Sequence, residues 1–169
     1  QIEVKSKENK GATFIIYLPG TSTVIKEVKT LEEMPLNVMG KGRILVMDDE
    51  DIILKTTSAM LIKLGYDVET AIDGKEAISM YQNALKKNYP FKAVIMDLTI
   101  PGCMGGKETI SNLLNIDQNV NAIVSSGYSN DPVMADYEKH GFKGVLTKPY
   151  NMNDLSNLML EMDHARRER

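Results

Sequence analysis

Five polar side chains stand where short apolar runs of the sequence end. Asp48 and Asp49 follow the run ILVM, Asp97 follows AVIM, Ser126 follows AIVS and Lys148 follows GVLT. In an open α/β sheet, the carboxyl ends of parallel strands face one crevice, and such proteins place their ligands there. Carboxylates, a hydroxyl and an ammonium that converge on one crevice therefore predict a ligand site.

The three carboxylates predict a bound cation. In a single crevice they would repel one another unless some are protonated or a hard cation lies among them. We expect Mg²⁺, because it prefers oxygen ligands and keeps several of its own waters. With Lys148 on the opposite side and Ser126 nearby, the site resembles a cradle for a phosphoryl group, in which catalysis is positioning and charge neutralisation. Asp97 would be the nucleophile.

Residues 42–165 alternate strand-like and helix-like segments. Helices are expected between the strands, with an N-cap at Asp73 or Asp131 and a stop before Gly65 or Gly141. Five β/α units in a row imply right-handed crossovers and a parallel sheet covered on both faces. We predict an α/β, flavodoxin-like (βα)5 three-layer sandwich, for which the strand order 2-1-3-4-5 is common. The expected strands are short and mostly apolar: 43–48, 67–71, 92–97, 121–126 and 143–147.

These polar positions lie in four segments that resemble the receiver domain of two-component response regulators, over residues 42 to about 165. Any one segment is weak evidence, but all four in this order, each at the end of its strand, are specific. The resemblance implies a chemotaxis-like receiver that takes a phosphoryl group from phosphohistidine onto Asp97 and acts as a conformational switch. The 2-1-3-4-5 strand order is known for this family and is adopted from it. The segments are Val46–Glu50, Met96–Gly102 with Gly105 and Gly106, Ser125–Gly127 and Thr147–Pro149.

The resemblance implies a metal ligand set. Asp49 and Asp97 would bind Mg²⁺ together with the backbone carbonyl of Thr99. Asp48 would support the metal, partly through water. An aspartate after a strand is more often a helix cap than a ligand, so the prediction depends on the three carboxylates jointly.

The resemblance also implies that Ser126 and Lys148 hold the phosphoryl oxygens, and that the bond from Lys148 to Pro149 is cis, which proline makes accessible. One position departs from the family pattern. Three residues before the lysine the family commonly has Tyr or Phe, whose ring moves inward on activation, whereas this chain has Val145. The usual aromatic switch is therefore in doubt, with Tyr128 and Phe142 as the aromatic residues that could replace it.

Two other functions remain open. One is a Mg²⁺-dependent phosphatase with an aspartyl-phosphate intermediate, as in haloacid-dehalogenase-like enzymes. Those enzymes usually have a second Asp two residues after the nucleophile, where this chain has Thr99. The other is a free-standing single-domain response regulator without a kinase.

The first forty residues need a separate account. Residues 1–5 and 12–18 alternate like strands around a turn at 8–11, which predicts a β-hairpin. The hairpin is similar to the last two strands of the ATP-binding domain of sensor histidine kinases. We therefore expect a hybrid sensor histidine kinase, with the hairpin as the C-terminal remnant of its ATPase domain (1–20), a linker (21–41) and a receiver domain (42–169). Without the upstream asparagine and glycine boxes, this chain should neither bind ATP nor phosphorylate histidine.

Composition limits the partners. A net charge of −3 over 169 residues gives no electrostatic footprint for nucleic acid, and no apolar run approaches the roughly 18 residues of a membrane span. One cysteine excludes an internal disulfide framework and fits the cytoplasm, even if the parent protein is membrane-attached. The expected partner is a histidine kinase dimerisation domain or a histidine phosphotransfer protein. A hairpin is marginal alone, so we expect it to pack on its own receiver or to form a homodimer.

Overall fold

The structure is a computed structural model that describes residues 1–18, 40–127 and 131–167, with side chains described as far as 163. Tyr128 and nearly all of the predicted linker lie outside these residues. The chain forms two compact units, Gln1–Pro35 and Leu36–Arg169. Among the helices that the structure describes, none is long and apolar enough to cross a membrane.

The first unit contains the predicted hairpin. Strands β1 (Ile2–Ser6) and β2 (Ala12–Ile16) pair antiparallel around a turn in which Gly11 has a φ of +83°. Val4 faces Phe14 across the pair, and both side chains are more than half exposed. The hairpin thus presents an apolar face.

The second unit is built on a five-stranded parallel sheet. Its strands follow the order β4-β3-β5-β6-β7, which is 2-1-3-4-5 when they are counted within this unit. The predicted fold class and strand order are confirmed. The strands are β3 (Arg43–Met47), β4 (Asp67–Ala71), β5 (Phe91–Asp97), β6 (Ala122–Ser126) and β7 (Gly144–Thr147).

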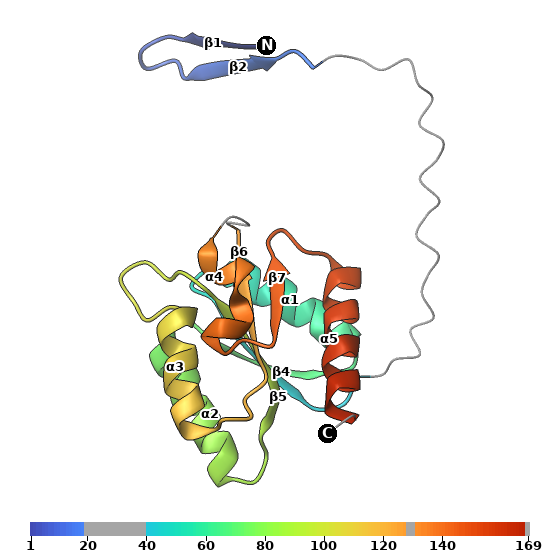
Figure 1. Ribbon diagram of the computed structural model, residues 1–169. Coiled ribbons are helices and arrows are strands. Elements are labelled where there is room, and N and C mark those ends of the chain that lie inside the picture. The colour runs from blue at the N-terminus through green and yellow to red at the C-terminus, as the bar shows by residue number, and fades with distance from the viewer. Residues whose placement is uncertain (19–39, 128–130, 168–169) are drawn as a thin grey trace, which may run out of the picture. The chain divides into compact units, whose positions relative to one another are not determined.

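Helices cover both faces of this sheet, which makes three layers (Figure 1). α1 and α5 contribute to the smaller of two core clusters, on one face, and α2, α3 and α4 contribute to the larger cluster on the other face. The helices are α1 (Asp51–Lys63), α2 (Gly74–Lys86), α3 (Gly106–Ile116), α4 (Pro132–Ala135) and α5 (Met152–Arg167).

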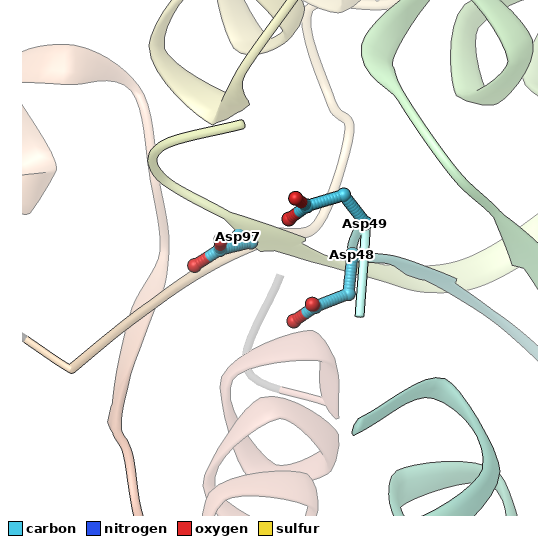
Figure 2. A group of neighbouring side chains, drawn as sticks. All are labelled: Asp48, Asp49 and Asp97. Atoms are coloured by element: carbon cyan, nitrogen blue, oxygen red, sulfur yellow. The ribbon is translucent and has the colours of Figure 1, made fainter. Parts of the chain in front are cut away.

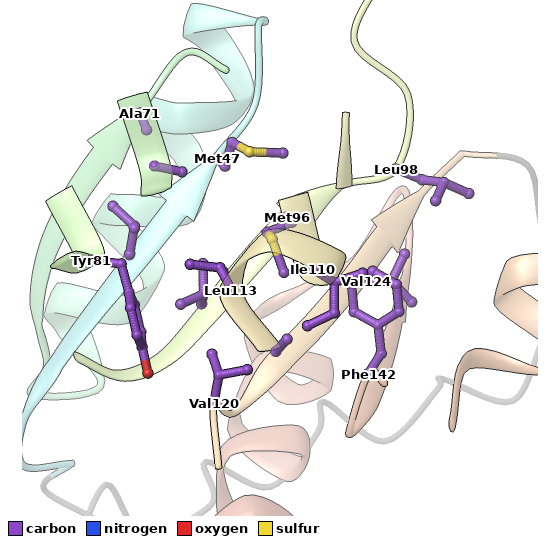
Figure 3. Close-up of a cluster of buried hydrophobic side chains, with 14 of the residues drawn as sticks. Met47, Ala71, Tyr81, Met96, Leu98, Ile110, Leu113, Val120, Val124 and Phe142 are labelled. Carbon is purple, nitrogen blue, oxygen red and sulfur yellow. The ribbon is translucent and has the colours of Figure 1, made fainter. Parts of the chain in front are cut away.

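The larger core cluster includes buried residues at the end of the sheet where the polar residues gather. Figure 3 shows Met96 and Val124 from the strands facing Ile110 and Leu113 of α3, with the ring of Phe142 beside them. All of these side chains are buried. Close packing on this scale holds the strand ends in fixed positions.

The start of α2 follows the prediction. Asp73 accepts a hydrogen bond from the backbone N–H of Glu76, and the Glu76 side chain accepts one from the backbone N–H of Ile72, each at 2.9 Å. The Asp73 bond satisfies an amide of the first helical turn, and the Glu76 bond satisfies the amide of the residue before the cap. α1 ends at Lys63, and Gly65 follows with a φ of +94°, the left-handed conformation expected there.

The predicted fourth helix is shorter than expected. α4 ends at Ala135, and a 3₁₀ turn over Tyr137–His140 continues to Gly141. Asp136 has φ −117° and ψ 36°, outside the α-helical region, and so breaks the segment in two. A helix this short has too few internal hydrogen bonds to persist by itself, so it depends on its packing in the fold.

Candidate functional site

Three carboxylates meet at the carboxyl ends of two neighbouring strands. β3 and β5 run in parallel with Met47 paired to Met96, so Asp48 and Asp97 follow at the same level. Figure 2 shows the side chains of Asp48 and Asp49 leaving the end of β3 toward the side on which Asp97 lies. One oxygen from each carboxylate lies within 4.8 Å of the others. The structure therefore brings together the three carboxylates that the sequence placed in one crevice.

The three carboxylates differ in exposure. Asp48 is only 2% exposed, Asp97 is partly buried and Asp49 is exposed. One oxygen of Asp48 accepts a hydrogen bond of 3.0 Å from the backbone N–H of Glu50, which orients the buried side chain. Three hard oxygen ligands that differ in this way suit a cation that keeps some of its waters, as Mg²⁺ does.

Lys148 contacts two of these carboxylates. Its Nζ lies 2.6 Å from an oxygen of Asp48 and 3.1 Å from an oxygen of Asp97. Its backbone N–H donates a 2.9 Å hydrogen bond to the carbonyl of Ser126, at the end of the neighbouring strand. The lysine therefore lies at the predicted edge of the sheet and offsets part of the negative charge there.

Burial and charge shift the pKa values of two site residues. Burial raises the pKa of Asp97; the nearby Lys148 ammonium counteracts part of this shift, and the carboxylates of Asp48 and Asp49 add to it. For Lys148, burial alone would lower the pKa, but hydrogen bonds and charge attraction from Asp48 and Asp97 outweigh burial and raise it. Lys148 therefore keeps its positive charge at neutral pH.

Two further predicted residues lie at the same edge. Ser126 is the last residue of β6 and is 3% exposed. After it, a Cβ added to Gly127 would meet nothing within 4 Å, so a side chain at that position would extend into open space. Thr99 is exposed in the loop that follows Asp97.

Two glycines let α3 begin very close to that loop. A Cβ on Gly105 would lie 2.5 Å from the carbonyl oxygen of Leu98, and one on Gly106 would lie 2.8 Å from that of Asp97. The backbone N–H of Gly106 donates a 3.1 Å hydrogen bond to the Leu98 carbonyl. Any other residue would push the helix off the loop, because real Cβ atoms do not approach backbone oxygens so closely.

The residues around Lys148 include the predicted cis bond and the position of the usual aromatic switch. The Lys148–Pro149 peptide bond is cis, as expected. Val145 is partly buried against the larger core cluster, and Phe142 is buried inside that cluster with 2% exposure. Phe142 is therefore a core residue in this conformation, and Tyr128 lies outside the described residues.

One contact beside the site was not predicted from the sequence. The hydroxyl of Tyr150, two residues after Lys148, lies 2.7 Å from the hydroxyl of Thr57 on α1. One feature of the sequence could have indicated this contact. Thr57 lies on the same helical stripe as Leu54 and Leu61, where an apolar residue is expected.

Comparison with known proteins decides the family. Residues 44–160 match the family model of the response regulator receiver domain. The chain belongs to this family. Its receiver domain is of the kind that serves two-component phosphorelay signalling.

Relatives of this receiver domain include both short and long proteins. The chain is 33% identical over 113 residues to the chemotaxis protein CheY of Thermotoga maritima, covering 66% of this chain and 88% of that protein. It is 26% identical over 166 residues to the sensor kinase CckA of Brucella abortus, covering 93% of this chain but only 17% of that kinase. The match with CckA leaves only about 12 of the 169 residues uncovered, so it extends into the hairpin.

Solved structures resemble the receiver domain closely. The receiver domain of the histidine kinase CKI1 from Arabidopsis thaliana, complexed with Mg²⁺ and BeF₃⁻, gives a TM-score of 0.65 at 26% identity and covers 73% of this chain and 90% of that chain. The chemotaxis protein CheY4 of Vibrio cholerae also gives 0.65 at 26% identity, with 73% and 99% covered.

Proposed function

We propose that this receiver domain accepts a phosphoryl group from phosphohistidine on Asp97 in a Mg²⁺-dependent reaction. The observation that carries the proposal is the cluster at the sheet edge, with carboxylate oxygens within 4.8 Å of one another and the Lys148 Nζ 3.1 Å from Asp97. Oxygen ligands for a hard cation and a fixed ammonium are the two features that phosphoryl transfer requires.

The residues of the cluster would share the metal. Asp49 and Asp97 offer accessible carboxylate oxygens, and the backbone carbonyl of Thr99 is the proposed third protein ligand. The buried Asp48 would support the metal, partly through water. When bound, Mg²⁺ neutralises charge on the phosphoryl oxygens. The family supports this assignment, since the related CKI1 receiver structure contains Mg²⁺.

The reaction is a transfer between two side chains. A carboxylate oxygen of Asp97 attacks phosphorus and forms a P–O bond as the P–N bond to histidine breaks, and the leaving imidazole nitrogen takes a proton. Ser126 donates a hydrogen bond to a phosphoryl oxygen, and Lys148 holds another by charge. Water later hydrolyses the acyl phosphate, which restores the Asp97 carboxylate and releases inorganic phosphate.

Phosphorylation would make the domain a switch. The phosphoryl group carries about 1.5 to 2 negative charges and replaces the single charge of the Asp97 carboxylate. The edge of the sheet therefore gains about 0.5 to 1 negative charge, and the phosphoryl group competes there with Asp48 for Lys148. The segments that carry Ser126 and Lys148 are the elements that this charge would bias.

Intact mass after incubation with acetyl phosphate and Mg²⁺ tests the proposal. The wild type should gain one phosphoryl group, whereas Asp97→Asn and a sample with EDTA should gain none. Equal labelling of wild type and Asp97→Asn would overturn the assignment. The family match favours a receiver over the phosphatase; steady turnover of a phosphomonoester would reverse that preference.

We also propose that the receiver (42–169) comes from a hybrid histidine kinase, with residues 1–20 as the end of its ATPase domain and 21–41 as the linker. The hairpin and the CckA match that reaches into it support this origin over a free-standing regulator. The partner would be a histidine kinase dimerisation domain or a histidine phosphotransfer protein, in the cytoplasm. A homodimer through the hairpin is a further proposal about partners, and sedimentation that finds only monomer at high concentration would remove it.

A further inference from the structure

A partly buried pair of hydroxyl groups joins helix α1 to the connection between β7 and α5. The hydroxyl of Thr57 lies 2.7 Å from that of Tyr150, although the two residues are 93 positions apart in the sequence. Thr57 is 1% exposed, and Tyr150 packs against the smaller core cluster. A hydrogen bond shielded in this way is stronger than one exposed to water.

The pair connects the two halves of the phosphoryl site. α1 begins at Asp51, two residues after Asp49. Tyr150 lies two residues after Lys148, the residue proposed to hold the phosphoryl group. One hydrogen bond therefore ties the helix that follows the metal carboxylates to the segment that carries the lysine.

Packing alone does not explain the hydroxyl of Thr57. The residue lies on the buried stripe of α1 with Leu54 and Leu61, where valine has nearly the same shape. Threonine has a lower helix propensity than most residues that could fill this position. The Thr57 hydroxyl bonds to the Tyr150 hydroxyl. This bond can position the segment that contains Tyr150, which core filling alone does not do.

The connection that carries Lys148 is short and is also attached at each of its ends. At its start, the backbone N–H of Lys148 bonds to the Ser126 carbonyl. At its end, the Asn151 side chain accepts a hydrogen bond of 2.8 Å from the backbone N–H of Asn153, at the start of α5. Tyr150 is the residue between these points that bonds to α1.

We infer that Thr57 and Tyr150 are a positioning pair that holds the Lys148 segment against α1 and so keeps the lysine aligned with Asp48 and Asp97. The inference rests on the proposed role of Asp97 and Lys148. Neither hydroxyl touches the phosphoryl group. The pair acts only through the place it gives to Lys148.

Two variants remove the bond while they keep the shape of the side chains. Thr57→Val and Tyr150→Phe should each slow labelling by acetyl phosphate about tenfold at saturating Mg²⁺, because small misplacements of a site group are costly to rate. The double variant should be no slower than either single variant. Thr57→Ser, which retains the hydroxyl, should restore most of the rate.

A second measurement needs neither metal nor reaction. In protein labelled with ¹³C at lysine Cε, the Lys148 resonance of the Mg²⁺-free domain should shift in Thr57→Val and Tyr150→Phe and return toward the wild-type position in Thr57→Ser. This readout separates the inference from the proposed function. Failure of the wild type to label would overturn the function, whereas the resonance would still test the pair.

Matched controls remove hydroxyls elsewhere. Thr56→Val deletes an exposed hydroxyl from the neighbouring position of α1, and Tyr81→Phe deletes a bond of 2.7 Å to Asp117. Both should leave the labelling rate and the Lys148 resonance unchanged. An unshifted Lys148 resonance in Thr57→Val and Tyr150→Phe, or a Thr57→Ser variant as slow as Thr57→Val, would overturn the inference.

Discussion

At the scale of single residues, the ionised carboxylate of Asp97 destabilises the folded domain when no cation is bound. The pKa of Asp97 is raised, first by burial, so its ionised form is less stable in the folded domain than in the unfolded chain. The unfolded chain therefore loses this proton at a lower pH than the folded domain does. The free energy of unfolding should fall as pH rises through the two pKa values and should stay lower above them.

Asp97→Asn should for this reason stabilise the Mg²⁺-free domain at neutral pH. We expect a gain of roughly 0.5–2 kcal/mol in the free energy of unfolding, a usual size for relief of an unfavourable charge. The gain should vanish below a pH of about 3.9, the ordinary aspartate pKa, where the wild-type carboxyl is protonated in both states. Urea unfolding at several pH values measures this difference. A variant less stable than the wild type at pH 7 would contradict the account.

Lys148 should matter for rate because its ammonium contacts Asp97 directly. Lys148→Met should slow labelling by acetyl phosphate by roughly 100-fold, as removal of a charge-stabilising group does in other enzymes. Lys143→Met is the control, since the Nζ of Lys143 bonds to the Asn119 carbonyl near the other end of β7. The measurement is the labelling rate of each variant by intact mass, after both variants have been shown to be folded. Equal rates would rule out a phosphoryl role for Lys148.

Residue types at strand ends were enough to predict which side chains converge, because parallel strands end at one edge. The sequence could not predict the partners inside the cluster. The short contact between Lys148 and Asp48, and the bond between Thr57 and Tyr150, depend on how β7 and α1 lie across the sheet. Both contacts join residues about a hundred positions apart, and no local pattern encodes such pairs.

At the scale of elements, strands and helix starts were predictable where one local rule governs them, such as capping at Asp73 or the glycine after α1. The fourth helix was predicted too long, because the backbone of Asp136 leaves the α-helical region after a single turn. The order of strands came from the family and not from spacing.

Because α3 lies so close to the loop after Asp97, one added methyl group should lower the stability of the domain strongly. Gly106→Ala should lower the free energy of unfolding by roughly 1–3 kcal/mol, because the new Cβ would overlap the Asp97 carbonyl oxygen. Gly127→Ala, where the Cβ meets open space, should change it by less than about 0.5 kcal/mol. Denaturant unfolding of both variants tests this. Equal stabilities would show that α3 shifts without cost.

At the scale of the whole molecule, every residue of the two core clusters and of the site lies within residues 44–162. Because this segment holds all of these residues, Leu36–Arg169 alone should fold and label with acetyl phosphate within about twofold of the full chain. Labelling rate and urea midpoint of the two proteins are the measurements. A large loss of labelling in the shorter protein would show that the hairpin contributes to the site.

The central claim is that Asp97 carries the phosphoryl group, and reductive trapping tests it most directly. After labelling, borohydride converts an aspartyl phosphate to homoserine, which exchanges one carboxyl oxygen for two hydrogens. Trypsin should release residues 93–107, in which Asp97 is the single acidic residue, separately from 44–55, which contain Asp48 and Asp49. We expect the altered mass in the peptide 93–107 alone. An altered 44–55 peptide with 93–107 unchanged would contradict it.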